Sequence, residues 1–231
     1  SRKARWTDTS QPGFAWRKTV YQDGENPFAD GTARFARTEK KKEKAFAEWI
    51  PDIPETGEYA VYVSYQTLPE SVSDAKYLVF HNGGVTEFKV NQQIGSGTWV
   101  YLGTFSFDKG VNDYGMVVLS NESQENGVVC ADAVRFGGGM GNIARGGQTS
   151  GLPRYLEGAR SAAQWAGMPA QVYGRPEADN DYADDINARS RTINYLSGGS
   201  VFNPDELGKG IPFEMSMALR SDAGVNKEDC I

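Results

Sequence analysis

Bulky and small side chains alternate through a series of short segments in the first 137 residues of the chain. The clearest segment is 98–107, where Trp99, Tyr101, Phe105 and Phe107 all fall on odd positions. Alternation at period two is typical of a β-strand with one buried face. The pattern predicts strands at 46–50, 58–65, 75–81, 85–90, 98–107, 116–120 and 128–136.

Turn residues separate these predicted strands. Asn82, Gly83 and Gly84 join 75–81 to 85–90, and such residues accept the positive φ angles of a tight hairpin at low cost. Short strands with turns between them predict a mainly β fold, an antiparallel β-sandwich or jelly roll, over residues 1–137. Four aromatic residues near the start are expected to seal one end of the sandwich: Trp6, Phe14, Trp16 and Tyr21.

The pattern changes after residue 137. Apolar residues recur at helical spacing in 152–166, a second helix is predicted at 182–196, and 211–219 is typical of a buried strand. Two helices and a strand are part of an α/β layer, which needs further strands to be complete. The sequence therefore predicts a sandwich at 1–137 followed by a partial α/β segment at 138–231.

Composition and charge narrow the classes of partner. The chain has 231 residues and a net charge of −6, whereas a nucleic-acid site needs a basic footprint. No apolar run approaches the roughly 20 residues that span a membrane. No signal peptide is visible, but the chain opens at Ser1 without a methionine. We interpret it as a fragment or a processed product, so the missing signal says nothing about export.

The sequence contains few residues that are suited to catalysis. Zinc needs three or four ligands of the His, Cys or carboxylate type, and the chain has one histidine, His81, and two cysteines. Ser221 lies beside Asp222 but has no histidine near it in sequence to act as a base. We therefore assign no catalytic residue, no metal site and no cofactor to this chain.

Sugar binding is the chemistry that the residues favour. A pyranose has apolar faces and polar edges, so its site needs an aromatic platform surrounded by polar groups. Trp99 and Tyr101 share a face of their predicted strand. Each of them either packs in the core or forms part of such a platform. Four polar residues are expected to be exposed beside them: His81, Asn82, Asn91 and Gln92. These six residues are the candidate glycan-binding set.

Five motifs in order resemble the golvesin-like domain of secreted bacterial proteins, which are often labelled xanthan lyase or N-acetylmuramoyl-L-alanine amidase. The motifs are Glu-Thr-Gly-Glu-Tyr-Ala-Val-Tyr-Val at 55–63, His-Asn-Gly-Gly-Val-Thr at 81–86, Val-Asn-Gln at 90–92, Gly-Thr-Trp-Val-Tyr-Leu-Gly at 97–103 and Ala-Asp-Ala-Val-Arg-Phe at 131–136. The resemblance covers residues 1–137. It implies a jelly roll similar to carbohydrate-binding modules, a polysaccharide or peptidoglycan partner, and export to the periplasm, cell surface or medium.

The tail resembles the same group of proteins, in which the module looks inserted into a zinc amidase-like α/β domain. The sequence Ser-Asp-Ala-Gly at 221–224 resembles a loop where the family pattern has His-Ser-Asp-Ala-Gly, with the histidine as a zinc ligand. This chain has Arg220 at that position, and a guanidinium offers no lone pair to zinc. The resemblance thus makes Arg220 and Asp222 a degenerate metal-site position, with zinc possible only in an intact parent enzyme.

Three functions stay open at this stage. The first is a non-catalytic accessory sandwich that binds glycan in an exported xanthan lyase-like or amidase-like protein. The second is a fragment of a zinc-dependent N-acetylmuramoyl-L-alanine amidase, a peptidoglycan hydrolase. The third is a structural insertion domain without a ligand. The sequence names no particular glycan and no oligomeric state.

Overall fold

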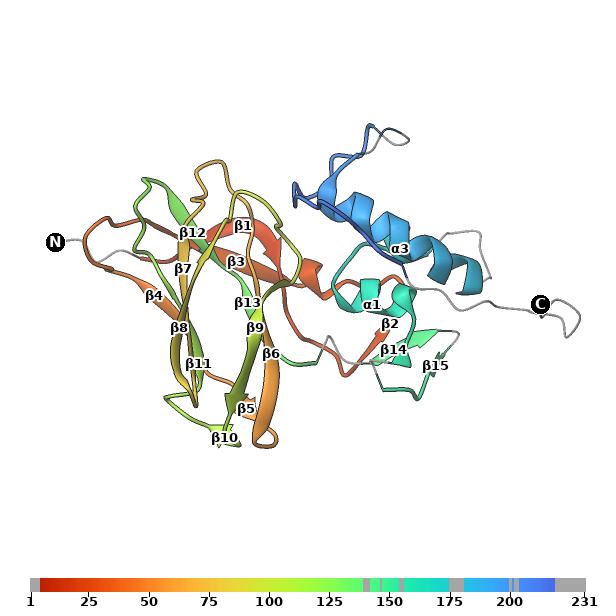
Figure 1. Cartoon of the computed structure of the whole chain (residues 1–231), viewed down its shortest axis with the longest axis horizontal. Coiled ribbons are helices and arrows are strands. Elements are labelled where there is room, and N and C mark those ends of the chain that lie inside the picture. The colour runs from red at the N-terminus through yellow and green to blue at the C-terminus, as the bar shows by residue number, and fades with distance from the viewer. Residues whose placement is uncertain are drawn as a thin grey trace, which may run out of the picture.

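The computed structural model describes residues 5–138, 142–145, 147–153, 156–174, 181–199, 201 and 204–218. They form two units that lie next to each other along the long axis of the molecule (Figure 1). The larger unit is an antiparallel β-sandwich, which confirms the predicted mainly β fold. The smaller unit combines short strands with helices, and we call it the helical unit.

The sandwich consists of short strands in several sheets. The strands are β1 (Thr7–Gly13), β3 (Gly31–Arg37), β4 (Phe46–Trp49), β5 (Asp52–Ile53), β6 (Gly57–Ser64), β7 (Ala75–His81), β8 (Gly84–Val90), β9 (Val100–Phe107), β10 (Gly110–Val111), β11 (Met116–Ser120), β12 (Val128–Ala131) and β13 (Ala133–Phe136). The sheet orders are β4-β11-β7-β8, β13-β6-β9, β1-β3-β12 and β10-β5. Each of the strands predicted from the alternating pattern is present.

The core lies between the β4-β11-β7-β8 and β13-β6-β9 sheets. Val61 and Val63 of β6 and Val117 and Leu119 of β11 are fully buried in it. Cys130 is buried there as a free thiol, and burial raises its pKa to about 12. The core is thus formed by the alternate residues of both sheets, as the period-two pattern requires.

A bulge interrupts the alternation in β9. Tyr62 of β6 pairs with Tyr101, but the next residue, Val61, pairs with Gly103, so Leu102 is the extra residue. Tyr101 consequently lies on the outer face and is 56% exposed, whereas Phe107 is 1% exposed and belongs to the core. The odd-numbered residues of 98–107 therefore do not share one face, and Tyr101 is not a core residue.

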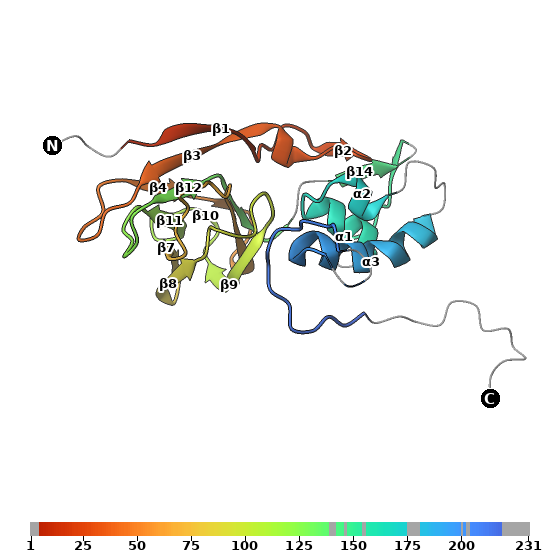
Figure 2. The ribbon, with the colours of Figure 1, turned by 90° about the horizontal axis from the view of Figure 1, so that it is seen from above.

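The first 38 residues hold structure that the sequence pattern did not reveal. β1 and β3 run along one side of the sandwich (Figure 2). The chain enters the helical unit after β1 and returns to β3 through the 3-10 helix η1 (Pro27–Ala29). The expectation that four aromatic residues seal the sandwich is wrong in part. Trp6 packs against the core, but Trp16 is 61% exposed and Tyr21 packs with Ile143 and Trp165 of the helical unit.

The predicted strand 128–136 is divided at Asp132. β12 pairs with β3, whereas β13 pairs with β6, so the chain changes sheets at this residue. The Asp132 carboxylate accepts hydrogen bonds from the Phe14 backbone N–H at 2.8 Å and the Ser64 hydroxyl at 2.9 Å. This carboxylate therefore connects three segments at the corner of the sandwich.

The helical unit combines a short strand that precedes β3 with elements that follow β13 in the sequence. Its elements are β2 (Val20–Gln22), β14 (Asn142–Arg145), β15 (Gln148–Thr149), α1 (Ala159–Trp165), α2 (Ala170–Tyr173) and α3 (Asp181–Ser197). β2 and β14 are parallel neighbours, although the strands β3 to β13 lie between them in the chain. The part of the sandwich from β3 to β13 is thus inserted between two adjacent strands of the helical unit, whereas β1 precedes β2. The division at residue 137 stays a prediction.

The structure confirms only some of the elements that the sequence predicts after residue 137. The helix predicted at 182–196 is confirmed as α3. Only α1 represents the helix predicted at 152–166, and it begins after the extended Gly158. The strand predicted at 211–219 is wrong over 211–218, because no described strand pairs with it and Met215 and Met217 are 78% and 77% exposed. None of the described helices is long and apolar enough to cross a membrane.

Candidate functional site

A cleft of about 840 Å³ opens at the edge of the sandwich. One part of its lining is the segment 48–54, which contains the end of β4 and all of β5. Another part is the segment 134–138, which contains most of β13. A volume of this size accommodates a ligand of several rings. Six aromatic side chains line the cleft: Phe14, Trp16, Trp49, Tyr59, Trp99 and Phe136.

The cleft exists because two sheets end next to each other. β4 is the edge of one sheet and β13 is the edge of another in the described part of the chain. Pro51 ends β4, since a prolyl nitrogen has no hydrogen to donate to a sheet. Ile53, which is 3% exposed, then anchors the following turn in the core.

β13 turns a backbone edge toward the cleft. The Gly137 N–H donates to the Ala60 carbonyl of β6 at 2.7 Å. In an antiparallel pair only every second residue hydrogen-bonds to the partner strand. Since Gly137 bonds to β6, the backbone N–H and C=O groups of Val134 and Phe136 point away from β6. Both residues line the cleft, so its apolar wall also carries peptide donors and acceptors.

Trp99 and Trp16 have different roles in this cleft. Trp99 is held by the edges of Phe14 and Phe28, with ring centroids 4.9 Å and 5.2 Å away, and its Nε1 is buried without a hydrogen-bond partner. Trp16 is 61% exposed, and its Nε1 donates to the Lys18 carbonyl at 2.5 Å. Trp99 is thus part of the wall, while Trp16 offers an open ring to a ligand.

A row of aromatic and cationic side chains connects the cleft with the outer face of the β13-β6-β9 sheet. Arg135, Tyr62 and Tyr101 are aligned across the three strands. The Arg135 guanidinium carbon lies 3.9 Å from the Tyr62 ring centroid and 5.1 Å from that of Trp99. Tyr101 follows with its ring 5.2 Å from Tyr62. We call Trp99, Arg135, Tyr62 and Tyr101 the aromatic row.

The six predicted sugar-binding residues are separated by the fold. Trp99 and Tyr101 both belong to the aromatic row, which brings them together. Asn91 is exposed but accepts from the Gln93 backbone N–H at 3.0 Å in a local turn. Asn91 and the remaining three residues do not line the cleft. Their roles in sugar binding stay predictions, apart from that of Gln92.

The expectation that Gln92 is exposed is wrong. Its side chain is fully buried and makes three hydrogen bonds in the core. Its Nε2 donates to the Tyr77 hydroxyl at 3.1 Å and to the Cys130 carbonyl at 2.9 Å, and its Oε1 accepts from the Cys130 N–H at 2.7 Å. An amide this well satisfied stabilises the fold and does not contact a ligand.

His81 and Asn82 belong to the hairpin between β7 and β8. The His81 Nδ1 accepts from the Gly83 backbone N–H at 3.1 Å, and its ring packs 4.7 Å from that of Phe105. Asn82 donates to the Asp108 carboxylate at 3.1 Å. These contacts stabilise the hairpin and the neighbouring turn.

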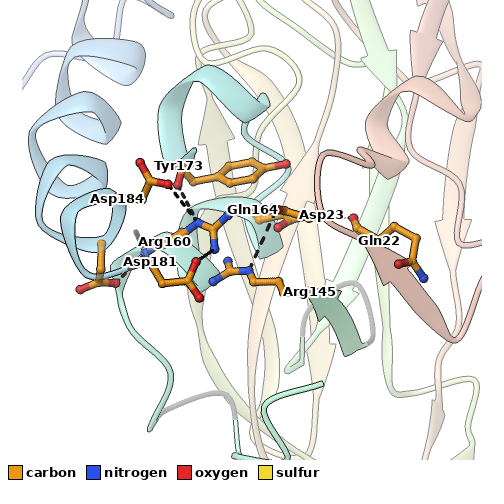
Figure 3. Close-up of polar contacts among 9 residues, drawn as sticks. Gln22, Asp23, Arg145, Arg160, Gln164, Tyr173, Asp181 and Asp184 are labelled. Carbon is orange, nitrogen blue, oxygen red and sulfur yellow. Dashed lines mark hydrogen bonds and ion pairs between the residues drawn. The ribbon is translucent and has the colours of Figure 1, made fainter. Parts of the chain in front are cut away.

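Arg160 and the acidic side chains around it form a second cluster in the helical unit (Figure 3). The Arg160 side chain is 8% exposed and pairs with Asp23 at 2.9 Å, with Asp181, and with Asp184 at 3.9 Å. Its Nε also donates to the Tyr173 carbonyl at 3.0 Å. This arginine therefore connects α1, α2 and α3 to the turn after β2, which is a structural task.

The described residues offer no group of side chains arranged to bind a metal ion. Among the residues that the structure describes, no three His, Cys, Asp or Glu side chains are grouped so that they could hold a metal ion. Arg220 and Asp222, the degenerate metal-site position, lie outside the described residues. The interpretation of that position stays a prediction.

Sequence reasoning missed most of the cleft. Trp49 and Phe136 are far apart in the chain and belong to different sheets, so no local pattern connects them. Arg135 gave one local signal, since it is the charged residue between the apolar Val134 and Phe136 of an alternating strand. Such a residue must point outward from the sandwich.

Comparisons with known proteins place these features in a family. A family model described as "Golvesin C-terminal domain" matches residues 6–138. Over 90 residues the chain is 33% identical to a xanthan lyase from Bacillus sp. strain GL1, covering 38% of this chain and 10% of that protein. A solved structure of Paenibacillus xanthan lyase matches with a TM-score of 0.43 and 28% identity, covering 57% of this chain and 11% of that one. The chain thus spans about a tenth of the length of these relatives.

Proposed function

Because the chain belongs to the Golvesin C-terminal domain family, whose model matches residues 6–138, we propose that it is a non-catalytic accessory module of a xanthan lyase-like protein. It binds polysaccharide in the cleft beside β13. We place the protein outside the cytoplasm, where polysaccharide of this kind is met.

The cleft carries this proposal. Trp16 offers an open ring at its mouth, and Trp49 and Tyr59 extend the apolar surface inside. Aromatic rings stack on the apolar faces of pyranoses, while the polar edges of a sugar need hydrogen-bonding groups. The backbone edge of β13 that points away from β6 and the side chains of Glu48, Asp52 and Arg135 supply such groups around the rings.

The relatives support the class of ligand. Both are named xanthan lyase, so xanthan is the substance on which those proteins act. Only the class, polysaccharide, is carried over to this chain, because the matched part is about a tenth of each relative. Peptidoglycan is the second polysaccharide partner to test, since the resemblance of the tail implies an amidase-like parent.

Affinity electrophoresis in gels that contain xanthan, and co-sedimentation with purified peptidoglycan, test the proposal. Retention of the chain on either polymer is expected. The Trp16→Ala variant should bind about fivefold more weakly, since one stacking ring is worth about 1 kcal/mol. Tyr182→Ala is the matched control, because Tyr182 is equally exposed but lies on α3. No retention of the wild-type chain on either polymer overturns the proposal.

A structural role for the sandwich is the second candidate. The insertion of β3 to β13 between the parallel neighbours β2 and β14 favours this role, because both ends of this inserted part are then fixed to one unit. A chain that binds neither polymer, but whose helical unit unfolds when the sandwich is destabilised, would support this candidate. The amidase activity of a parent enzyme stays a prediction.

A further inference from the structure

We infer that Arg135 makes the cleft selective for acidic polysaccharides, with a sugar carboxylate as the group that it recognises. This inference rests on the proposed function, since it names the class of polysaccharide that the same cleft takes. It derives from the position of the arginine in the aromatic row.

The guanidinium of Arg135 is fixed by the rings beside it. It lies over Tyr62 at 3.9 Å and over Trp99 at 5.1 Å, measured from its central carbon to the ring centroids. Trp99 is itself held in place by Phe14 and Phe28. Stacking on rings reduces the freedom of the arginine before a ligand arrives, so less entropy is lost on binding.

A stacked guanidinium meets a ligand along its edge. Its five N–H donors lie in the plane of the group, so it can serve a protein acceptor and a ligand at the same time. Two parallel donors match the two oxygens of a carboxylate, and such charge-assisted pairs are about twice as strong as neutral hydrogen bonds. A sugar hydroxyl offers neither the charge nor the second oxygen.

The other charges of the lining orient an acidic ligand. Glu48 and Asp52 belong to the 48–54 part of the lining, while Arg135 belongs to the 134–138 part. Both acidic residues are exposed and repel a carboxylate, but they accept hydrogen bonds from sugar hydroxyls. A uronate ring is therefore expected to turn its carboxylate to Arg135 and its hydroxyl edge to the acidic residues.

Polygalacturonate and its fully methyl-esterified form are the probes, because they share a backbone and differ in the charge of each sugar. We expect the wild-type chain to bind polygalacturonate at least about tenfold more tightly than the ester, as a charged pair in place of a neutral contact implies. The preference should fall as sodium chloride is added, since the charges are partly exposed.

Two variants make the test specific. Arg135→Gln should bind both polymers with equal affinity, and Arg135→Lys should keep only part of the preference because an ammonium lacks the paired donors. Thermal melting shows whether each variant is folded. If Arg135→Gln does not fold, Glu48→Gln serves in its place: it removes a repelling charge from an exposed position and should strengthen binding of polygalacturonate alone.

The outcomes separate this inference from the proposed function. Equal binding of both polymers by the wild-type chain, weakened by Trp16→Ala, overturns the acidic preference and leaves the glycan-binding cleft in place. A preference that persists in folded Arg135→Gln, or that Arg135→Lys retains in full, also overturns the role assigned to Arg135. Failure of the wild-type chain to bind polygalacturonate, in a preparation that xanthan or peptidoglycan retains, overturns the acidic preference alone. Failure on xanthan and peptidoglycan as well overturns both proposals.

Discussion

At the scale of one residue, Asp132 holds a corner of the sandwich with hydrogen bonds, although burial disfavours its negative charge. Its carboxylate accepts from the Phe14 N–H and the Ser64 hydroxyl where β12 changes to β13. Burial raises the pKa of this carboxyl, and the two hydrogen bonds oppose that rise without cancelling it. The ionised form is therefore less favourable in the folded chain than in the unfolded chain.

Asp132→Asn is expected to raise the free energy of unfolding at neutral pH. A carboxyl whose pKa is raised on folding destabilises the protein above its folded pKa, and this penalty disappears as the pH falls below the unfolded value of about 4. The amide keeps an acceptor for Phe14 and gains a donor for Ser64. Urea unfolding at about pH 7 and about pH 4 should show an advantage of the variant that shrinks at the lower pH.

Asp113→Asn provides the control for the Asp132 prediction, because Asp113 is an exposed residue of a turn. It should leave stability within about 0.5 kcal/mol of the wild-type value. An Asp132→Asn chain that is less stable than the wild type at both pH values would show that the charge, rather than the hydrogen bonds alone, is needed at the corner.

At the scale of the element, β9 shows why the sequence predicts strands better than the faces of strands. The strands predicted at 75–81 and 116–120 coincide with β7 and β11, because their alternation is unbroken. In β9 the extra residue Leu102 reverses the alternation, and the sequence carries no sign of it. A bulge depends on the pairing partner, so one strand alone cannot reveal which of its aromatic residues is exposed.

The same dependence on distant partners explains the other differences. β1 is a largely polar segment, and it becomes a strand only because β3 pairs with it. The 211–218 segment has the apolar pattern of a strand but no partner in the described chain, so it stays irregular. The cleft was predictable only through Trp99, because Trp16, Trp49 and Arg135 meet there through the packing of separate sheets.

Gly103→Ala tests the packing of β9 beyond the bulge. A Cβ at this position would lie 2.8 Å from the Phe105 ring, which packs on His81 and Phe88. The ring must shift within the core, so the free energy of unfolding should fall by about 1–3 kcal/mol. Chemical denaturation measures the loss. Gly57→Ala is the control in β6, since a Cβ there meets nothing closer than 3.9 Å and should change stability little.

At the scale of the whole molecule, the sandwich and the helical unit are connected in several ways. The chain passes from β2 into the sandwich and returns at β14, which is the neighbour of β2. The Asn26 side chain, at the start of η1 on the way to β3, donates to the Gly167 carbonyl of the helical unit at 2.8 Å. Such double attachment gives the cleft a fixed position relative to the helical unit.

Gly167 of the helical unit packs directly against Phe28 of η1. It has a φ of +81°, and a Cβ there would overlap the ring of Phe28. Phe28 in turn packs against Trp99 in the wall of the cleft. Gly167→Ala therefore adds backbone strain of about 1–2 kcal/mol and also forces the two units apart. We expect the free energy of unfolding to fall by about 3 kcal/mol or more.

Gly151→Ala distinguishes the two parts of this effect. Gly151 also has a positive φ, of +67°, but no atom lies within 4 Å of its Cβ position. Only backbone strain is expected there, so urea unfolding should show a clearly smaller loss than for Gly167→Ala. If the two variants lose equal stability, the contact between Gly167 and Phe28 does not hold the units together. A larger loss in Gly167→Ala, together with weaker polysaccharide binding, would mean that the helical unit supports the wall of the cleft through Phe28 and Trp99.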